Sequence, residues 1–580
     1  GALLNRWLAC HLSGLGGMFV AVVASFTLAG VSVSAEPIQR VTFEADIQPL
    51  LTRFGCNAGA CHGKSRGQNG FALSLLGFDS DFDHAALVRE GRGRRIQAES
   101  PANSLLLRKA TAQMPHGGGK KLDPNGPYYK LIAEWIAAGA PRTPPDAPRI
   151  VKVEAEPAAH TLKPGESLKL KVVAIYSNGF RRDVTEGSAF QSNDTTVAAV
   201  APEGLVKAGP LPGEAAVMAR YMNHIAVTAI SIPLAGTPAP DAYAVLDSGH
   251  PVDGHVRDKL RVLGFTPSAM APETTWLRRA HLRIIGRLPT SAEVTAFLAD
   301  KSPDKREKVI DKLLERPEYA DFWANKWADL LRPNPYRAGI KATRSIDSWL
   351  REAFRANIPY DRFATELVTA QGTSWNNGAV VIFRDRPEPV EIASMVSQIF
   401  LGVRLDCAKC HNHPFENWTQ EDYYRIAAVF ARVKHAPKGA LVSLATTGET
   451  AHPSTGKVLA PYGDAVADPR TDRRVGFAKW LTKPGNPYFA RVEVNRIWYW
   501  LFGRGIVHPV DDFRSSNPPA VPELLDALAL EFERSGYDRK HVVRLICSSR
   551  TYQRATATNK FNEGDEALFS RYPIRRLSAE

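Results

Sequence analysis

The chain has 580 residues, enough for several domains, and its 44% hydrophobic and 23% charged residues are the composition of a globular protein. Long polar low-complexity tracts are missing from the sequence, which excludes a mainly disordered chain. The formal net charge of +13 suits acidic partners or an anionic surface. Basic residues are interleaved with acidic ones, however, and the aromatic-basic pattern of a nucleic-acid binder is missing, so we expect a solvated basic surface and no nucleic-acid partner.

The N-terminus has the pattern of an export signal. Arg6 precedes an apolar run over residues 12–33, and Val33-Ser34-Ala35 stands just before Glu36-Pro37. This order predicts a signal peptide over residues 1–35, cleaved after Ala35, although the run is also long enough for an uncleaved membrane anchor. Either alternative predicts a periplasmic or cell-surface protein. The chain begins with Gly1 and stops in mid-pattern at Glu580, so we expect a fragment of a longer protein.

Four of the six cysteines form two pairs, and a histidine follows each pair. The first pair is Cys56 and Cys61, separated by four residues and followed by His62. Two such thiols can add to the vinyl groups of a porphyrin while the adjoining imidazole becomes an axial iron ligand. The alternative in an exported domain is a Cys56–Cys61 disulfide.

A sixth ligand for this first haem is available in Gln113-Met114-Pro115-His116, which three glycines follow. Both Met114 and His116 are candidates, since methionine and histidine are each common axial ligands. We favour His116, because the glycines after it let the backbone approach the ring and leave the imidazole free to project.

The second pair, Cys407 and Cys410 with His411 directly after it, has the two-residue spacing of c-type haem attachment. A disulfide or redox dithiol and half of a zinc site are the alternatives. His413 lies too close to His411 in sequence to reach the opposite face of the same ring, so a hydrogen-bonding role is expected.

The distal ligand of the second haem is left open by the sequence. His508, just before Pro509, is the leading candidate, His435 and His452 are rivals, and an open sixth position is equally compatible. No catalytic residue is assigned. Asp511 and Asp512 could form an acid/base pair or a metal site. We expect capping groups or partners of Arg504 and Arg514 instead, since neither a nucleophile nor a phosphate-binding loop accompanies them.

Secondary-structure patterns divide the chain further. Helices are expected over residues 41–51, 128–140, 275–286, 291–298, 304–314, 319–331 and 420–433, the last with Thr419 as N-cap and Asp422 three residues on. Short strands are expected at 150–153, 167–174, 197–200 and 226–232, between linkers at 143–148 and 236–240. Trp323 and Trp327 share a helical stripe that predicts core packing. The expected fold class is therefore multidomain and mainly α, with one β-sandwich.

These motifs resemble known families. Residues 40–142 have the order of a class I cytochrome c, and Gly165, Asp183-Val184-Thr185 and Gly204-Leu205-Val206 resemble a bacterial immunoglobulin-like domain of the second group. The chain from Arg278-Arg279 through Cys407–Phe415 to Ser549-Arg550-Thr551-Tyr552 resembles the large multidomain cytochrome proteins abundant in planctomycetes. That resemblance covers nearly the whole chain and implies a haem role more directly than it implies a reaction.

We therefore expect the chain to contain five segments: a signal peptide (1–35), a cytochrome c-like domain (36–145), an immunoglobulin-like β-sandwich (150–235), a helical haem domain (242–435) and a truncated helical C-terminal domain (470–580). The expected function is one-electron transfer by an exported dihaem cytochrome with redox partner proteins. The alternatives are a haem-dependent oxidoreductase acting on a substrate such as a carbohydrate, and a haem-free surface interaction protein.

Overall fold

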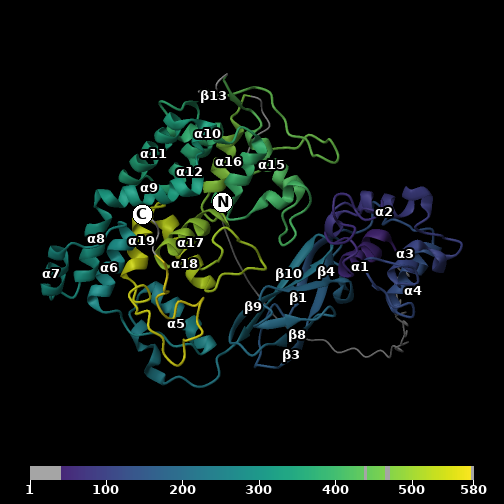
Figure 1. The fold of residues 1–580 in the computed structure, drawn as a ribbon, viewed down its shortest axis with the longest axis horizontal. Coiled ribbons are helices and arrows are strands. Elements are labelled where there is room, and N and C mark those ends of the chain that lie inside the picture. Colours follow the sequence, from purple (N-terminus) through teal and green to yellow (C-terminus); the bar gives the residue numbers. More distant parts are fainter. Residues whose placement is uncertain (1–40, 437–440, 464–469, 577–580) are drawn as a thin grey trace, which may run out of the picture. The chain divides into compact units, whose positions relative to one another are not determined.

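The computed structural model describes residues 41–436, 441–463 and 470–576, so the predicted signal peptide lies outside the described residues. Within them the chain is a mixed α and β protein of several regions. Figure 1 shows short helices at the start of this range, strands over residues 150–232 and helices through most of the remainder. The N-terminal region and the large helical region each bury a hydrophobic cluster, and the strand region buries two.

The N-terminal region consists of short helices around one core. They are a turn of π-helix (Phe43–Ile47), α1 (Gln48–Arg53), α2 (Ser80–Val88), α3 (Leu105–Ala110) and α4 (Pro127–Ala137). The helix predicted at 41–51 therefore begins as a π-turn and continues as α1. Trp135 of α4 is fully buried, with its ring 5.7 Å from that of Phe43, and its Nε1 donates to the Pro141 carbonyl over 3.0 Å. This core fixes the two ends of the region to each other.

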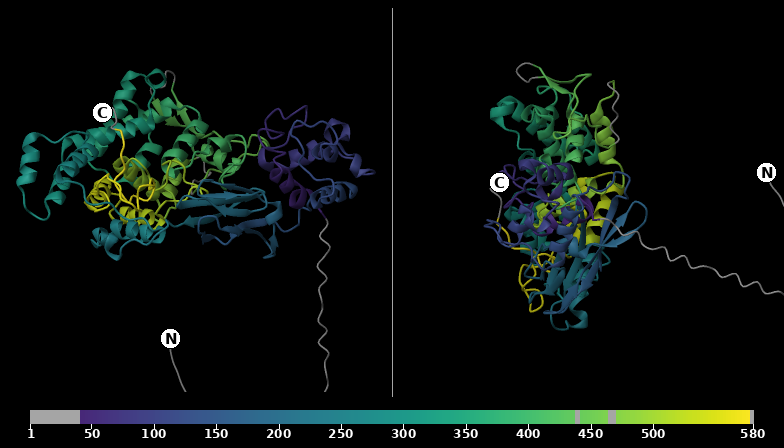
Figure 2. Two further views of the ribbon diagram at one scale, coloured as in Figure 1. Left: turned by 60° about the horizontal axis from the view of Figure 1, so that its bottom comes forward. Right: turned by 90° about the vertical axis from the view of Figure 1, so that its right-hand side faces the viewer.

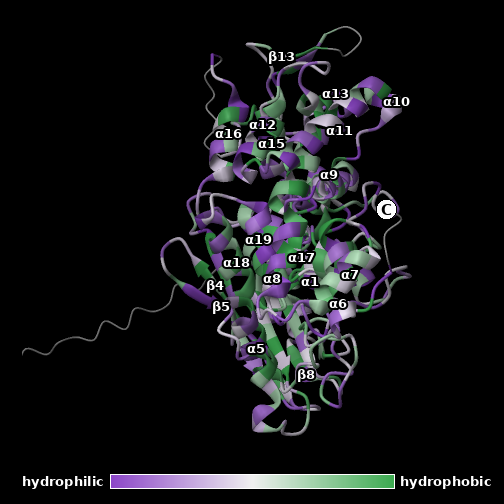
Figure 3. Ribbon diagram, turned by 90° about the vertical axis from the view of Figure 1, so that its left-hand side faces the viewer, coloured by the Kyte–Doolittle hydropathy of each residue, from purple (hydrophilic) through white to green (hydrophobic). Residues whose placement is uncertain are grey.

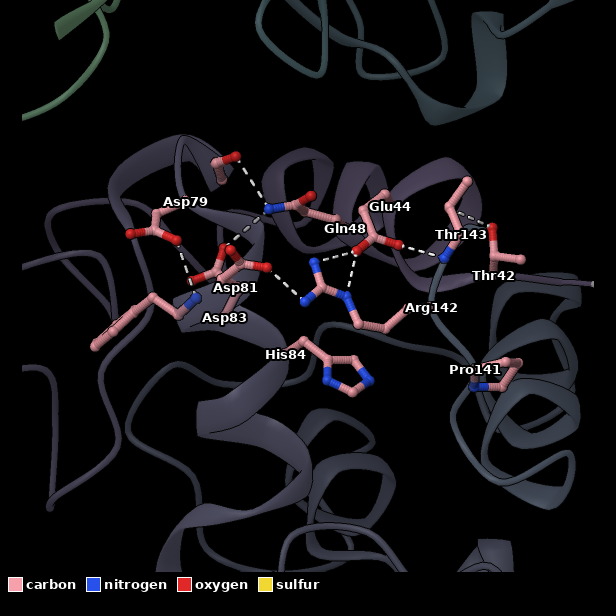
Figure 4. A network of polar contacts seen from close by, with 12 residues as sticks. Thr42, Glu44, Gln48, Asp79, Asp81, Asp83, His84, Pro141, Arg142 and Thr143 are labelled. Carbon is pink, nitrogen blue, oxygen red and sulfur yellow. Dashed lines mark hydrogen bonds and ion pairs between the residues drawn. The ribbon is translucent and has the colours of Figure 1, made fainter. Parts of the chain in front are cut away.

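Polar contacts close the same region (Figure 4). Arg142 pairs with Glu44 and Asp81, and the Thr143 backbone N–H donates to Glu44 over 2.7 Å. Asp83 is fully buried, where it accepts hydrogen bonds from Ser74 and from Gln48 Nε2. Burial raises the pKa of Asp83 to about 6, since its hydrogen bonds offset only part of the desolvation.

The strand region contains three sheets, in the orders β1-β4-β5, β2-β10-β9-β6 and β3-β8-β7. The strands are β1 (Ile150–Glu156), β2 (Ala159–Thr161), β3 (Ser167–Lys169), β4 (Lys171–Tyr176), β5 (Arg181–Asp183), β6 (Ala189–Ser192), β7 (Ala198–Val200), β8 (Leu205–Ala208), β9 (Gly213–Tyr221) and β10 (His224–Ile232). β9 and β10 form an antiparallel hairpin, while β2 pairs with β10 in parallel. Figure 2 shows these strands from two further directions.

The predicted strands are present, with one correction. The run expected at 167–174 is interrupted at Leu170, and the two pieces belong to different sheets, because β3 pairs with β8 and β4 pairs with β1 and β5. The immunoglobulin-like assignment of this region stays a prediction.

The remaining region is mostly helical and holds the largest core. Its helices are α5 (Pro251–Leu263), α6 (Glu273–Ile284), α7 (Ser291–Ala299), α8 (Lys305–Leu314), α9 (Pro317–Leu331), α10 (Pro335–Ala338), α11 (Ile340–Arg355), α12 (Tyr360–Val368), α13 (Val381–Asp385), α14 (Pro389–Val396), α15 (Gln420–Phe430), α16 (Arg473–Thr482), α17 (Phe489–Phe502), α18 (Pro522–Arg534) and α19 (Arg539–Ser548). Strands β11 (Gly372–Thr373), β12 (Val433–His435) and β13 (Leu441–Leu444) add a small sheet. Figure 3 shows hydrophilic and hydrophobic residues mixed along helices such as α8, as expected where one face packs inward.

Two predictions for these helices are confirmed. Trp323 and Trp327 of α9 are fully buried in the core. α6 ends at Ile284, two residues before Gly286. Gly286 has a left-handed φ of 72°. It also leaves no room for a side chain, since a Cβ there would lie 2.5 Å from the Phe322 ring. Glycine is therefore required at that helix end for both conformation and packing.

The first and last parts of the helical region are joined through one buried carboxylate. Asp253 of α5 accepts hydrogen bonds from the Thr551 backbone N–H and hydroxyl and from the Arg550 backbone N–H, over 2.7–2.9 Å, and from Ser248. Its side chain is fully buried. Among the described residues, no helix is both long and apolar enough to cross a membrane.

Candidate functional site

The first cysteine loop follows α1 and folds back on itself. The backbone N–H of Cys56 donates to Leu51 over 2.8 Å, and that of His62 donates to Cys56 over 3.0 Å. Gly63 is required at the end of the loop, because a Cβ there would lie 1.9 Å from the Asn57 carbonyl oxygen. Cys56 and Cys61 are both free thiols, and burial raises the pKa of Cys56 to about 11. The loop is thus ordered without a disulfide.

The imidazoles of His62 and His116 form a matched pair. Their ring centroids are 6.4 Å apart and their planes are 9° from parallel. Nδ1 of His62 donates to the Phe71 carbonyl over 2.9 Å, and Nδ1 of His116 donates to the Gly119 carbonyl over 2.8 Å. Each Nε2 therefore keeps its lone pair for a ligand. Burial also lowers the pKa of His62, which favours the neutral form that binds metals.

A cavity of about 380 Å³ lies beside this pair. Cys56, Cys61, His62 and His116 all line it. The rest of the lining includes apolar side chains and four cations but no carboxylate: Leu51, Phe71, Leu73, Leu87, Leu105 and Leu106, with Arg94, Arg95, Lys109 and Lys121. The volume lies within the roughly 300–1,000 Å³ of ligand pockets, and the lining suits an apolar ligand that carries negative charge.

The two predicted sixth ligands differ in their relation to this cavity. Pro115, His116, Gly117 and Gly118 line it, whereas Met114 is half-buried and is not one of its lining residues. The Met114 backbone N–H donates to Arg108 over 3.2 Å, which ends the turn after α3. The structure therefore brings His116, and not Met114, together with the first cysteine loop.

The second cysteine loop lies at the surface before α15. Cys407 and Cys410 are exposed free thiols, while Ala408 between them is buried. Nδ1 of His411 donates to the Asn412 carbonyl over 2.7 Å, which again leaves Nε2 unengaged by this bond. The ring of His411 lies 6.3 Å from that of Phe78.

Hydrogen bonds at the start of α15 hold this loop in place. The Gln420 backbone N–H donates to Asn412 Oδ1 over 3.0 Å, and Gln420 Nε2 donates to the Lys409 carbonyl over 3.1 Å. Thr419 and Asp422 form the capping box that their spacing predicts, so this helix start is confirmed. The loop is positioned by a local sequence signal.

His413 is part of the same turn and is buried. Its backbone N–H donates to Trp418 over 2.8 Å, and its Nδ1 accepts from the Phe415 backbone N–H over 3.2 Å. Burial first, and then the nearby Arg514 charge, lower the pKa of His413 to about 4. A neutral imidazole with these contacts is in keeping with a hydrogen-bonding role.

The predicted distal ligands of the second site make their contacts elsewhere. The His508 ring lies 6.3 Å from that of Tyr499, and its buried Nδ1 has no hydrogen-bond partner in the part of the chain that the structure describes. His435 ends β12, and His452 Nδ1 accepts from the Ser454 backbone N–H over 3.3 Å. The structure does not bring any of these three imidazoles into ring contact with His411 within the described ranges.

The pair of acidic residues near His508 forms ion pairs, with one correction to the expected partners. Asp512 pairs with Arg514 over 3.1 Å, as predicted, but Asp511 pairs with Arg404 and not with Arg504. Against the effect of burial, hydrogen bonds from Arg404 and Gln398 lower the pKa of Asp511. In the described ranges no group of three or more His, Cys, Asp or Glu side chains is arranged to hold a metal ion.

The sequence patterns above did not predict two features of this site: the cationic residues that line the cavity and the turn that holds His62. Gln68 and Phe71 pair across Asn69 and Gly70, both of which have positive φ. The Asn-Gly dipeptide is a signal for such a hairpin turn and could have predicted it. Nothing in the sequence marks Arg95 as the residue that packs behind the turn.

Comparison with family models gives two matches. Residues 251–435 match PSCyt2, described as a protein of unknown function (DUF1549), and residues 473–580 match PSD1, described as a protein of unknown function (DUF1553). Both are planctomycete-associated domain families, which agrees with the type of protein that the sequence resembles. Comparison with curated proteins gives no match. The helical half of the chain is thus similar to two planctomycete-associated families.

Proposed function

We propose that this chain is an exported dihaem c-type cytochrome that transfers single electrons. The observation that carries the proposal is the His62–His116 pair. Two imidazoles that bind one metal ion from opposite sides have centroids roughly 6 Å apart, since each nitrogen lies about 2.0–2.1 Å from the metal and each ring adds its own radius. The 6.4 Å between the centroids of His62 and His116 is close to that spacing.

The remaining residues of the cavity also fit a covalently attached haem. Cys56 and Cys61 would attach the porphyrin, the leucines and Phe71 would pack against it, and the cations would accompany its carboxylates. The group, when bound, supplies an iron that takes up and releases one electron. The chain's own residues would fix both imidazole tautomers through backbone carbonyls and would hold Cys56 as a protonated thiol before attachment.

We propose that Cys407, Cys410 and His411 hold the second haem, as their spacing indicates. The exposed thiols are accessible to attachment, and the capping box fixes the loop that carries them. The proposal keeps the cytochrome c-like, immunoglobulin-like and export assignments made from the sequence, and it implies redox partner proteins that are acidic where they meet a basic surface.

A second candidate function, a haem-dependent oxidoreductase, is favoured by one observation. In the described ranges none of His508, His435 and His452 is in ring contact with His411, and a haem on this loop would then keep a coordination position for a small molecule. Optical changes on adding a small ligand such as cyanide, assigned to the second haem alone, would support this candidate.

The test is the haem content of the chain exported from a host that attaches c-type haem, measured by pyridine haemochrome and intact mass. We expect two haems, of which Cys56→Ala with Cys61→Ala removes one and Cys407→Ala with Cys410→Ala removes the other. A single haem at the second motif would leave the first as a dithiol or disulfide. A chain without haem would overturn the proposal and leave a surface interaction protein.

Ligation is tested in the Cys407→Ala, Cys410→Ala background, in which the first haem is observed alone. We expect His116→Ala to abolish the low-spin spectrum, while Met114→Ala retains it. The reverse result would assign the sixth ligand to Met114.

A further inference from the structure

Arg95 is a buried cation on the wall of the cavity that holds His62. It is 7% exposed, and its guanidinium donates to the Ala86 carbonyl and, over 2.8 Å, to the Gly70 carbonyl. Its neighbour Arg94 lines the same cavity but is exposed. Burying a guanidinium is costly unless its N–H groups are satisfied, so this placement indicates a specific role.

The segment that Arg95 contacts is the one that holds His62. Asn69 and Gly70, with φ of 51° and 72°, form the two-residue turn that pairs Gln68 with Phe71. Phe71 contacts His62 twice, because its carbonyl accepts from His62 Nδ1 over 2.9 Å and its ring lies 4.5 Å from the imidazole. The imidazole is therefore fixed by Phe71 in both tautomer and orientation.

Arg95 holds Phe71 from behind. Its guanidinium lies 4.5 Å from the Phe71 ring centroid, on the ring that also meets His62, while it binds the carbonyl of the preceding Gly70. The two 4.5 Å separations place the positive charge no more than about 9 Å from the His62 ring. Arg95 is thus linked to the ligand both by contact and by charge.

That charge is only partly neutralised. The nearest carboxylate is that of Glu90, 3.7 Å away and half-exposed, and the cavity lining contains no acidic residue. An exposed carboxylate at this distance is screened by water and compensates a buried cation incompletely. The guanidinium also remains protonated, as arginine does in proteins.

We infer that Arg95 is a positioning residue for His62 that also raises the reduction potential of the first haem. This inference rests on the proposed function. A positive charge favours the reduced iron, which carries one positive charge less than the oxidised iron. A metal bound at His62 would lie roughly 3 Å beyond the ring centre, and so up to about 12 Å from this charge. At that distance and an effective dielectric constant of about 20, the effect on the reduction equilibrium is roughly tenfold. For a one-electron couple, tenfold corresponds to about 59 mV.

The test is the midpoint potential of the full chain in the Cys407→Ala, Cys410→Ala background. We expect Arg95→Gln to lower the potential by about 59 mV, a tenfold change, and Arg94→Gln to lower it by less than half as much, because Arg94 is exposed. Arg95→Lys keeps the charge and is expected to retain most of the potential. Equal shifts in Arg95→Gln and Arg94→Gln would overturn the inference.

Glu90→Gln provides an independent arm, since Glu90 is half-exposed and its loss does not threaten folding. Removing this carboxylate leaves Arg95 less compensated, so we expect the potential to rise by roughly twofold, or about 18 mV. An unchanged or lowered potential would overturn the inference even if Arg95→Gln fails to fold. Haem content is measured first in every variant. Absence of haem from the parent chain would defeat the proposed function, whereas an unshifted potential in a chain that contains haem would defeat only this inference.

Discussion

Gly118→Ala is a small change that, under the proposed haem ligation, should weaken the binding of His116 to the first haem. A Cβ at position 118 would lie 3.0 Å from Cε1 and 3.2 Å from Nε2 of His116. Non-bonded carbon atoms prefer about 3.5–4.0 Å, so the imidazole must move by a few tenths of an ångström. It cannot move freely, because its Nδ1 is bonded to the Gly119 carbonyl over 2.8 Å.

The expected size of the effect follows from the side-chain torsions. Rotating the ring away from the new methyl group by about 30° costs about 0.5–1.5 kcal/mol. A cost of about 1 kcal/mol weakens ligation by His116 roughly fivefold. An added ligand that competes for the same coordination position should therefore bind about fivefold more tightly.

The assay is a spectroscopic titration with imidazole of the Cys407→Ala, Cys410→Ala chain, with and without Gly118→Ala. Gly117→Ala is the matched control, because a Cβ at that position has no atom within 4 Å. We expect the control to bind imidazole like the parent. Equal affinities for Gly118→Ala and Gly117→Ala would show that His116 is not the group displaced.

The remaining predictions concern stability and reactivity. The pKa of Asp83 is raised to about 6, so the native state binds more protons than the unfolded state between about pH 4 and 6. The free energy of unfolding should therefore fall by roughly 2–3 kcal/mol as the pH rises through that window. In urea denaturation curves Asp83→Asn should remove this fall, and the control Asp79→Asn should keep it. Asp253→Ala leaves the buried N–H donors of Thr551 and Arg550 without an acceptor and should lower the free energy of unfolding by about 2–4 kcal/mol. The control Asp258→Ala, at the exposed face of α5, should change it by less than about 1 kcal/mol. Similar denaturation midpoints for the two variants would contradict this prediction. In chain made without haem, iodoacetamide at pH 8 should label the exposed Cys407 and Cys410 before Cys56, because the Cys56 thiol is half-buried with its pKa raised to about 11. Peptide mass spectrometry would report the order, and faster labelling of Cys56 would show that its loop is open.

Local chemistry made several features predictable from the sequence. The capping box of Thr419 and Asp422 and the end of α6 near Gly286 depend on residues three or four positions apart, so the sequence contains the whole signal. The burial of Trp323 and Trp327 follows from their helical period in the same way. The haem assignment of the two Cys-His motifs also rests on local spacing, and it stays a prediction.

Where a local sequence pattern was compatible with more than one structure, pairing with distant segments decided which structure formed. The apolar run at 167–174 is compatible with one strand, but pairing with two different partners divides it at Leu170. Asp511 has two arginines nearby in sequence, yet Arg404 is its partner, because the chain after α17 packs against the loop that precedes the second cysteine pair. Sequence distance does not report such pairings.

The composition of the first site depended on the fold in the same way. The sequence by itself predicts Cys56, Cys61 and His62 as haem-binding residues, with Met114 or His116 as the sixth ligand. Only the tertiary structure places His116 at the cavity, 6.4 Å from His62 across 54 positions of sequence (from 62 to 116), and leaves Met114 outside the lining. The identity of the sixth ligand stays a prediction. Arg95 behind Phe71 and the exposure of Cys407 and Cys410 were decided by the tertiary structure as well, because burial and charge at a site are set by segments that only folding brings together.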